Sequence, residues 1–258
     1  MNARAIQLVL HYDGSGFSGW QRQPDTRTVQ GVLESALARL CDSAIPVLGA
    51  GRTDAGVHAT GQVAGVRVPP RWAPPALRRA LNALLPDDVW VEAAHEMRPE
   101  FHARFDAVAR AYRYKVGLDD AAASPFRRRV EWAYRRPIDE ALLAAATRDV
   151  VGEHVFRAFA VRGTAPPHDT HRCRVTRAEW LPRAGGLDFV IEANRFLHHM
   201  VRFLTGTLLD IAGGRRPPDD IARLLAAADN QDVSPPAPPH ALFLEHVRYP
   251  AHLYLDDR

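Results

Sequence analysis

The chain reads Gly49-Ala50-Gly51-Arg52-Thr53-Asp54-Ala55-Gly56-Val57-His58-Ala59 at residues 49–59, and this stretch decides how the rest is interpreted. It joins two strand-like segments, residues 45–48 and 62–68, and it places Arg52 and Asp54 two residues apart in a loop bounded by glycines. Taken alone, Thr-Asp-Ala-Gly is typical of a turn in which the aspartate bonds its own backbone and Gly56 takes a left-handed conformation. The local pattern therefore favours a turn over a site of chemistry.

Hydrophobic periodicity around this stretch predicts the order strand, helix, strand, helix, strand. The first helix is predicted from apolar residues at helical spacing in residues 29–40, and the second, at 75–85, has a proline at its start. The predicted strands cover residues 5–12, 45–48, 62–68 and 89–97, and a glycine-rich loop occupies residues 13–24. This order favours a sheet backed by helices on one face.

A comparable series begins near residue 108, with a strand through Tyr112 and Tyr114. The other predicted elements are helices at 138–151, 196–212 and 219–228 and strands at 175–181, 187–193 and 241–248. Residues 163–170 are predicted to form a loop, and residues 234–239 a stiff proline-rich connector. We expect an α+β fold with two similar sheet-plus-helix domains, residues 1–107 and 108–258, and an active-site cleft between them.

The composition is that of a folded globular protein, since 47% of the residues are hydrophobic and 24% are charged. The N-terminal residues lack the long apolar stretch of a signal peptide, and no apolar run approaches the roughly 20 residues of a membrane span. We therefore expect a cytoplasmic location. Two cysteines, Cys41 and Cys173, can form neither a disulfide framework nor a CxxC pair of the kind that binds structural zinc.

The net charge of +3 is compatible with a nucleic-acid partner but is small for 258 residues. Lys115 is the only lysine, so nearly all of the positive charge is arginine. One part of the chain is crowded with arginines, namely Arg98, Arg104, Arg110, Arg113, Arg127, Arg128, Arg129, Arg135 and Arg136. Such a cluster is more often a solvated face than a binding site, so basicity permits a nucleic-acid partner without establishing one.

A dinucleotide-binding motif is suggested by residues 14–19, which satisfy G-x-G-x-x-G directly after a predicted strand. That motif needs a helix to begin within the glycines so that its N-terminus can hold the pyrophosphate. Here Gln21-Arg22-Gln23-Pro24 intervenes before any helix, and no acidic residue ends a second strand at the expected distance. A tight loop that uses glycine for its backbone freedom is the better interpretation.

A metal cluster is suggested by His168-Asp169-Thr170-His171-Arg172-Cys173. The segment has no matching second half elsewhere in the sequence, as structural zinc sites have. A metal site is therefore not predicted.

The stretch around Asp54 resembles the loop G-R-T-D-A-G-V-H-A of the tRNA pseudouridine synthase A family (tRNA pseudouridine(38-40) synthase). In that family the aspartate of the loop is the catalytic nucleophile, so the resemblance implies this role for Asp54. Residues 12–23, 101–114 and 196–206 are similar to further family motifs in the same order. The departures are Val155, where the family commonly carries aspartate, and a loose match at Arg172-Cys173-Arg174.

The resemblance implies an isomerase that converts uridine to pseudouridine in the anticodon stem-loop of tRNA, at positions 38, 39 and 40. It also implies the pseudouridine synthase fold, with halves like RNA-recognition (RRM, ferredoxin-like) domains, and a homodimer. Tyr112 would pack on the target base, Arg202 would pair with the nucleophile, and Arg52 would fill the space that the uridine leaves in its stack. No cofactor and no metal are expected, because the isomerisation needs neither a redox agent nor an external energy source.

The reaction breaks the C1′–N1 bond, turns the uracil and joins C5 to C1′. A carboxylate suits the sugar side of this reaction, since it can stabilise positive character at C1′, form a covalent adduct or move a proton at C2′. The sequence leaves these three roles of Asp54 open. A carboxylate must be ionised for any of them, and a neighbouring guanidinium such as that of Arg202 favours the ionised form.

A different class of function is an RNA-binding protein without catalysis, since two RRM-like domains can hold RNA without altering it. An NAD-dependent enzyme is a third class, which the context of residues 14–19 disfavours. The loop that carries Asp54 distinguishes the first class from the others.

Overall fold

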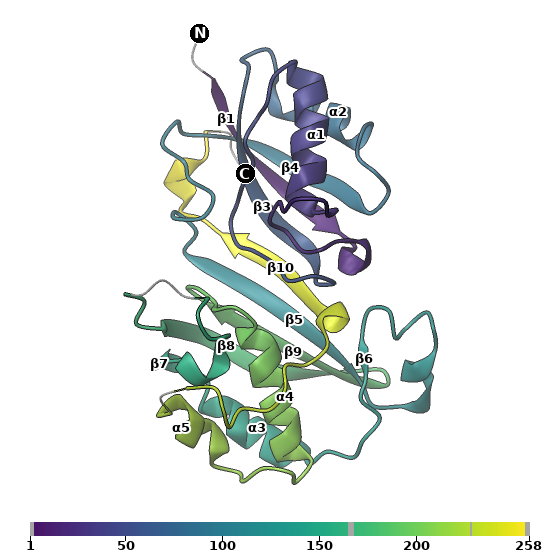
Figure 1. Cartoon of the computed structure of the whole chain (residues 1–258), viewed down its shortest axis with the longest axis vertical. Helices are drawn as coiled ribbons and strands as arrows, with labels where there is room; N and C mark the ends of the chain where they lie inside the picture. The colour runs from purple at the N-terminus through teal and green to yellow at the C-terminus, as the bar shows by residue number, and fades with distance from the viewer. Residues whose placement is uncertain (1–2, 165–167, 228, 256–258) are drawn as a thin grey trace. The chain divides into compact units, whose positions relative to one another are not determined.

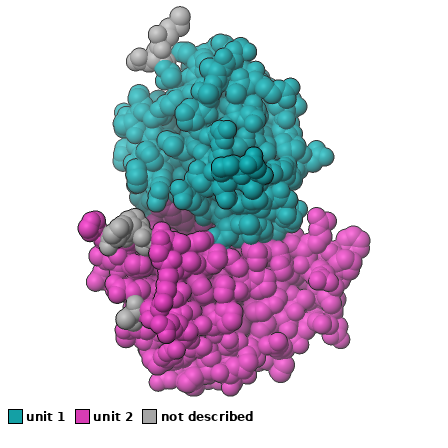
Figure 2. Space-filling view, in the orientation of Figure 1, with its two compact units in different colours: residues 1–108, 243–258 teal, residues 109–242 magenta. Residues whose placement is uncertain are grey.

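The computed structural model describes residues 3–164, 168–227 and 229–255 (Figure 1). The chain divides into two compact units, which Figure 2 colours separately. Unit 1 comprises Met1–Val108 together with Phe243–Arg258, and unit 2 comprises Ala109–Leu242. The division between the units lies next to the expected domain boundary at residue 107, and the last strand of the chain is grouped with the first unit.

Unit 1 is a sheet with two α-helices. Its strands are β1 (Arg4–Tyr12), β2 (Leu48–Gly49), β3 (His58–Val68), β4 (Val89–Met97) and β10 (Leu242–Arg248), and its helices are α1 (Val29–Cys41) and α2 (Pro74–Asn82). The strand order is β4-β1-β3-β10, with β2 beside β3. β1 runs antiparallel to both neighbours, with Leu8 opposite Ala64 and Ala94, whereas β10 runs parallel to β3. Short 3-10 helices occupy Gly14–Gly16 and Ala251–Leu253.

The two helices of unit 1 cover the same face of its sheet (Figure 1). Alternate residues of β1 supply the core on this face, and the fully buried apolar side chains from strand and helices are Ile6, Leu8, Leu10, Val29, Leu33, Leu37, Leu77 and Leu81. α1 begins after Thr28, whose hydroxyl accepts the Gly31 N–H (3.3 Å), and it ends at Asp42 in a left-handed conformation. The predicted arrangement of a sheet backed on one face is confirmed.

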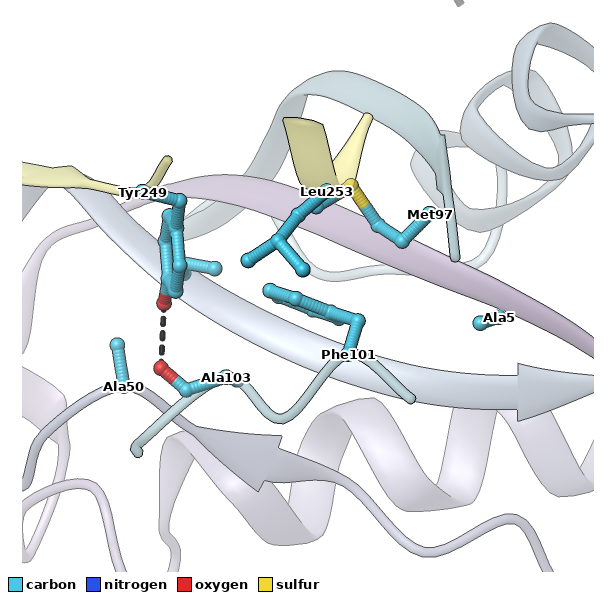
Figure 3. Close-up of a cluster of buried hydrophobic side chains, with 8 residues drawn as sticks. Ala5, Ala50, Met97, Phe101, Ala103, Tyr249 and Leu253 are labelled. Carbon is cyan, nitrogen blue, oxygen red and sulfur yellow. Dashed lines mark hydrogen bonds between the residues drawn. The ribbon is translucent and has the colours of Figure 1, made fainter. Parts of the chain in front are cut away.

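The opposite face of this sheet is covered by residues 98–106 and by residues 249–254, which include the 3-10 helix Ala251–Leu253. They enclose a second buried apolar cluster of unit 1 (Figure 3), formed by Ala5, Ala50, Val63, Met97, Phe101, Ala103, Tyr249 and Leu253. Within it the rings of Phe101 and Tyr249 meet edge to face, with centroids 5.2 Å apart. The Tyr249 hydroxyl donates to the carbonyl of Ala103. The C-terminal residues thus pack onto strands from the start of the chain.

Unit 2 combines β-strands with three α-helices in its described residues. Its strands are β5 (Ala109–Gly117), β6 (Trp132–Ala133), β7 (Gly152–Val155), β8 (Arg172–Arg183) and β9 (Gly186–Ala193), and its helices are α3 (Glu140–Arg148), α4 (Met200–Ala212) and α5 (Asp220–Leu225). The order β5-β9-β8-β7 is antiparallel, and β6 pairs in parallel with β5. Three 3-10 helices occupy Asp120–Ala123, Arg157–Phe159 and Pro239–Ala241.

The predicted α+β fold class is confirmed, and most predicted elements are found within a few residues of their expected bounds. The helix expected at 196–212 begins only at Met200, because His199 takes a left-handed conformation (φ 63°) that interrupts the helical path. The strand expected at 45–48 is reduced to β2, and the short strands β6 and β7 were not predicted. Residues 165–167 of the expected loop and residue 228 of the expected helix lie outside the described residues.

Within the described ranges, no helix combines the length and the apolar character that a membrane crossing requires.

Candidate active site

The loop that carries Asp54 connects β2 to β3 and contains a hydrogen-bonded turn. The N–H of Ala50 donates to the Val63 carbonyl (2.8 Å) and so extends the pairing of the two strands. The N–H of Val57 donates to the Asp54 carbonyl (3.1 Å), and Gly56 between them has a left-handed backbone with φ 79°. The sequence prediction of a turn with Gly56 at a left-handed position is confirmed. Asp54 itself is half-buried and Arg52 is exposed.

The glycine-rich loop after β1 holds this turn in place. The N–H of Trp20 donates to the Thr53 carbonyl (3.0 Å), and the N–H of Gly56 donates to the Phe17 carbonyl (3.4 Å). Gly19 has φ 93°, and a Cβ atom at this position would lie 2.8 Å from the Thr53 carbonyl oxygen. A Cβ atom on Gly14 would lie only 2.1 Å from the Val57 carbonyl oxygen. The glycines are therefore required by the close approach of two loops.

This packing accounts for the apparent dinucleotide motif at residues 14–19. After the 3-10 helix Gly14–Gly16 the chain continues as loop, and α1 begins only at Val29. Its first N–H groups are also engaged, since those of Val29 and Gln30 donate to the carbonyls of Gly19 and Trp20 (3.3 and 3.1 Å). No α-helix therefore begins among the glycines of residues 14–19, as pyrophosphate binding would require.

Buried polar side chains fix the residues on either side of Arg52. The Tyr12 hydroxyl bonds the Thr53 hydroxyl (2.7 Å), and the Gln62 amide donates to the Gly51 carbonyl (3.0 Å). All three side chains are nearly inaccessible to solvent. Burial raises the pKa of Tyr12 to about 12, and the hydrogen bonds from Thr53 and Gln62 only partly oppose this rise. Tyr12 is thus a neutral hydrogen-bonding group at physiological pH.

Sequence reasoning missed Tyr12, Gln62 and Thr53 as supports of the loop. The available signal was weak: Tyr12 opens the segment at 12–23 that resembles a family motif, and Thr53 immediately precedes Asp54. The hydrogen bonds join residues far apart in the chain, which no local pattern reveals.

The segment at 101–107 packs against Ala50, where the loop that carries Asp54 begins. Ala103 and Phe101 belong to the cluster that also contains Ala50, the residue that leads into the turn (Figure 3). Arg67 of β3 donates to the carbonyls of Pro99 and Phe101 (2.6 and 2.9 Å) and so fastens this segment to the sheet. The segments 12–23, 49–59 and 101–107, which resemble family motifs, thus pack together in unit 1.

Tyr112 lies in unit 2, in the middle of β5 opposite Ile191. Its side chain is mostly buried, with 8% exposed, and its ring meets that of Phe196 edge to face with centroids 5.0 Å apart. This contact fixes the plane of the Tyr112 ring.

Arg202 lies in the first turn of α4, also in unit 2. Its Nε donates to the Ala237 carbonyl (2.7 Å), and the N–H of Ala237 donates back to the Arg202 carbonyl (3.0 Å). Burial raises the pKa of Tyr114 well above its usual value, and the positive charge of Arg202 partly opposes this rise. The Tyr114 hydroxyl donates to the Pro238 carbonyl (2.9 Å). The proline-rich segment thus orients the arginine.

The apolar side chains at helical spacing along α4, Val201, Leu204, Leu208 and Ile211, are all buried. Leu197 and His198 fall within the range expected for this helix but precede its first residue. The Thr205 hydroxyl is buried and donates to the Val201 carbonyl within the helix (2.8 Å).

The residues once considered for a metal cluster have structural contacts. Arg195 donates to the Asp169 carboxylate (2.5 Å), which also accepts the N–H of His171 (2.7 Å). These contacts lower the pKa of Asp169, the bond from Arg195 having the largest effect. Burial raises the pKa of the Cys173 thiol to about 12, which opposes the thiolate form that zinc binds. The donor set fits a structural role for this segment.

Comparisons with known proteins show the family of the chain. A family model described as tRNA pseudouridine synthase matches residues 8–106 and 146–250. The tRNA pseudouridine synthase A of Citrifermentans bemidjiense is 40% identical over 95% of this chain and 98% of its own length. That of Chloroflexus aurantiacus is 43% identical, over 96% of this chain and 89% of its own length, and that of Limosilactobacillus fermentum is 40% identical over 94% and 95%.

The match is to a class of isomerases that act on RNA, and it extends over nearly the whole chain. The chain belongs to the tRNA pseudouridine synthase family.

Proposed function

We propose that the chain converts uridine to pseudouridine in the anticodon stem-loop of tRNA, at positions 38, 39 and 40, with the carboxylate of Asp54 as the nucleophile. The observation that carries the proposal is the loop of residues 49–59. Its neighbours Gly51 and Thr53 are tied to Gln62 and Tyr12, while the half-buried Asp54 and the exposed Arg52 are presented from the same turn.

The chemistry follows from the position of the carboxylate on a rigid support. A nucleophile that attacks or stabilises C1′ must be held at the sugar while the uracil detaches and turns. The backbone of Asp54 is fixed by the bond from Val57 to its carbonyl, and the preceding residue is fixed by Trp20. Little reorganisation is therefore required of the loop when substrate binds.

Three further residues have proposed roles; those of Tyr112 and Arg202 rest on the family resemblance, and that of Arg52 rests on its place in the loop of Asp54. Tyr112 packs on the target base, and its ring orientation is already set by Phe196. Arg202 supplies a positive charge for the nucleophile, and its guanidinium is steered by the Ala237 carbonyl. Arg52 is exposed, as a side chain must be to fill the space that a flipped uridine leaves. The proposal includes a homodimer and a cytoplasmic location, where tRNA is available.

The test is release of tritium from tRNA labelled at uridine C5, because C5 loses its proton only after it has bonded to C1′. The pseudouridines are then mapped in the product. The proposal predicts stoichiometric release and modified uridines at positions 38, 39 and 40. Tight binding of tRNA by folded protein without release would instead support an RNA-binding protein without catalysis. Release with modification elsewhere in the tRNA would contradict the proposed positions alone.

A further inference from the structure

The connection from β5 to β6, residues 118–131, presents an aromatic side chain to solvent. Phe126 is 86% exposed, the largest exposed fraction among the large apolar side chains of the described residues. Leaving a phenylalanine in water forgoes the stabilisation that its burial would bring. Neither the core of unit 2 nor the residues proposed for catalysis account for it.

The connection is a rigid structure. Arg127 donates two bonds to the Asp119 carboxylate (both 2.9 Å) and pairs with Glu131 (2.6 Å), whose buried carboxylate also accepts from Arg183. The Ser124 carbonyl accepts the N–H groups of Arg127 and Arg128 (3.1 and 2.8 Å). Phe126 is therefore held on a turn that is fixed on both sides.

The connection also approaches β5 very closely. A Cβ atom on Gly117 would lie 2.3 Å from the Cβ of Ala122, so the 3-10 helix Asp120–Ala123 packs directly against the end of the strand. The sequence Phe126-Arg127-Arg128-Arg129 thus divides into an internal anchor, Arg127, and three exposed residues. We call Phe126, Arg128 and Arg129 the 126–129 patch.

The charge of the 126–129 patch is positive. Arg128 and Arg129 are exposed, and Arg127 between them and Phe126 pairs with Asp119 and Glu131. The guanidinium of Arg135 lies 3.9 Å from the carboxylate of the exposed Asp120, and that of Arg136 lies 5.7 Å from the ring centre of Tyr134. An exposed aromatic ring with guanidinium groups beside it matches the two features of a nucleotide, a flat base and an anionic phosphate.

We infer that the 126–129 patch is a second RNA-binding site, distinct from the loop that carries Asp54, and that it binds an unpaired nucleotide of the substrate. The Phe126 ring stacks on the base, and Arg128 and Arg129 contact the flanking phosphates. The inference rests on the proposed function, since it takes the substrate to be RNA. A contact with another copy of the chain is the competing explanation, but two exposed arginines per copy would repel each other across such an interface.

The experiment measures binding of unmodified tRNA by fluorescence anisotropy, without turnover, for Phe126→Leu, Phe126→Tyr and Arg128→Gln/Arg129→Gln. Leucine keeps an apolar side chain but cannot stack, so Phe126→Leu is expected to bind about 5- to 100-fold more weakly, while Phe126→Tyr binds as the wild type does. The double arginine variant is expected to reduce the slope of log affinity against log salt concentration by about 1.5. Val151→Ala and Arg148→Gln are matched controls of exposed apolar and basic residues in the same unit.

Two results would overturn the inference. One is unchanged tRNA affinity in Phe126→Leu. The other is a difference in sedimentation mass between Phe126→Leu and the wild type in the absence of RNA, which would make the patch a contact between copies. Failure of the proposed function looks different, because it is the absence of tritium release by the wild type. A wild type that releases tritium and a Phe126→Leu variant with unchanged affinity would leave the proposed function intact and remove the inference alone.

Discussion

Asp54 follows a residue that is tied at both its backbone and its side chain. The Thr53 carbonyl accepts the N–H of Trp20, and the Thr53 hydroxyl bonds the buried Tyr12. Gly51 is held by Gln62 in the same way. Hydrogen bonds therefore fix the residues on both sides of the exposed Arg52, and Asp54 directly follows the fixed Thr53. These bonds explain how a short turn can hold the backbone of Asp54 in a defined position.

Gly19→Ala tests whether the two loops of unit 1 depend on their close approach. The substitution forces a residue with a Cβ atom to adopt φ 93° and brings that atom to 2.8 Å from the Thr53 carbonyl. We expect a loss of about 1–3 kcal/mol in the free energy of unfolding, measured by urea denaturation. Gly51→Ala is the control, since a Cβ atom there meets nothing within 4 Å. Equal stability of the two variants would contradict the account of these glycines.

Tyr12→Phe tests the buried hydroxyl through pH. The pKa of Tyr12 is raised from its ordinary value of 10.0 to about 12. Below pH 10 the tyrosine is neutral in both the folded and the unfolded chain, so its titration does not change the free energy of unfolding there. Between pH 10 and 12 the unfolded chain ionises while the folded chain does not, and the wild type loses about 1.4 kcal/mol per pH unit through this group. Unfolding curves of the phenylalanine variant should show a shallower decline in this window. Parallel declines would mean that Tyr12 titrates normally in the folded state.

At this scale the sequence predicted part of the site. The left-handed Gly56 follows from a local pattern, since turn chemistry depends on neighbouring residues. The bonds of Tyr12 and Gln62 could not be predicted, because they connect positions brought together only by the pairing of β1 with β3.

Among the elements, α4 is hydrogen-bonded to the proline-rich segment 234–239 through Arg202. The proline-rich segment 234–239 lies against this helix, and its Ala237 exchanges backbone and side-chain bonds with Arg202. The sequence predicted a stiff connector here, and the structure adds that the connector orients an arginine. The start of α4 was misplaced because the left-handed conformation of His199 depends on packing rather than on helical propensity.

Gly206→Ala tests this contact between helix and connector. A Cβ atom on Gly206 would lie 2.5 Å from the Pro235 carbonyl oxygen, so the connector has to move away from α4. We expect a loss of about 1–3 kcal/mol in unfolding free energy from this overpacking, together with a fall in the rate of pseudouridine formation. Thermal unfolding and tritium release on the same preparation measure both. An unchanged rate in a destabilised variant would show that the activity does not depend on the contact of the connector with Arg202.

At the scale of the whole molecule, a segment late in the chain packs against strands formed early in the chain. Residues after 242 belong to unit 1, where Tyr249 and Leu253 close the cluster beside Ala50 and Ala103 (Figure 3). Periodicity predicted the strand at 241–248 but not its parallel neighbour β3, because hydrophobic patterns define which face of a strand is buried and not which strand lies beside it.

Leu253→Ala tests this assignment of the C-terminal segment. Leu253 is 6% exposed and Leu255 is 53% exposed, so the two positions form a matched pair. We expect Leu253→Ala to cost about 2–5 kcal/mol, with faster hydrogen exchange in β1 and β3 rather than in unit 2. Leu255→Ala should change stability by less than about 0.5 kcal/mol. Faster exchange confined to unit 2 would contradict the assignment.

The carboxylate of Asp54 is tested most directly by Asp54→Asn in the tritium-release assay. Asp42→Asn is the control, since Asp42 is an exposed aspartate of the same unit in a left-handed conformation that asparagine also accepts. The account predicts that Asp54→Asn folds and binds tRNA with near wild-type affinity but releases no tritium, while Asp42→Asn releases tritium at the wild-type rate. Measurable turnover by Asp54→Asn would contradict its role as the nucleophile.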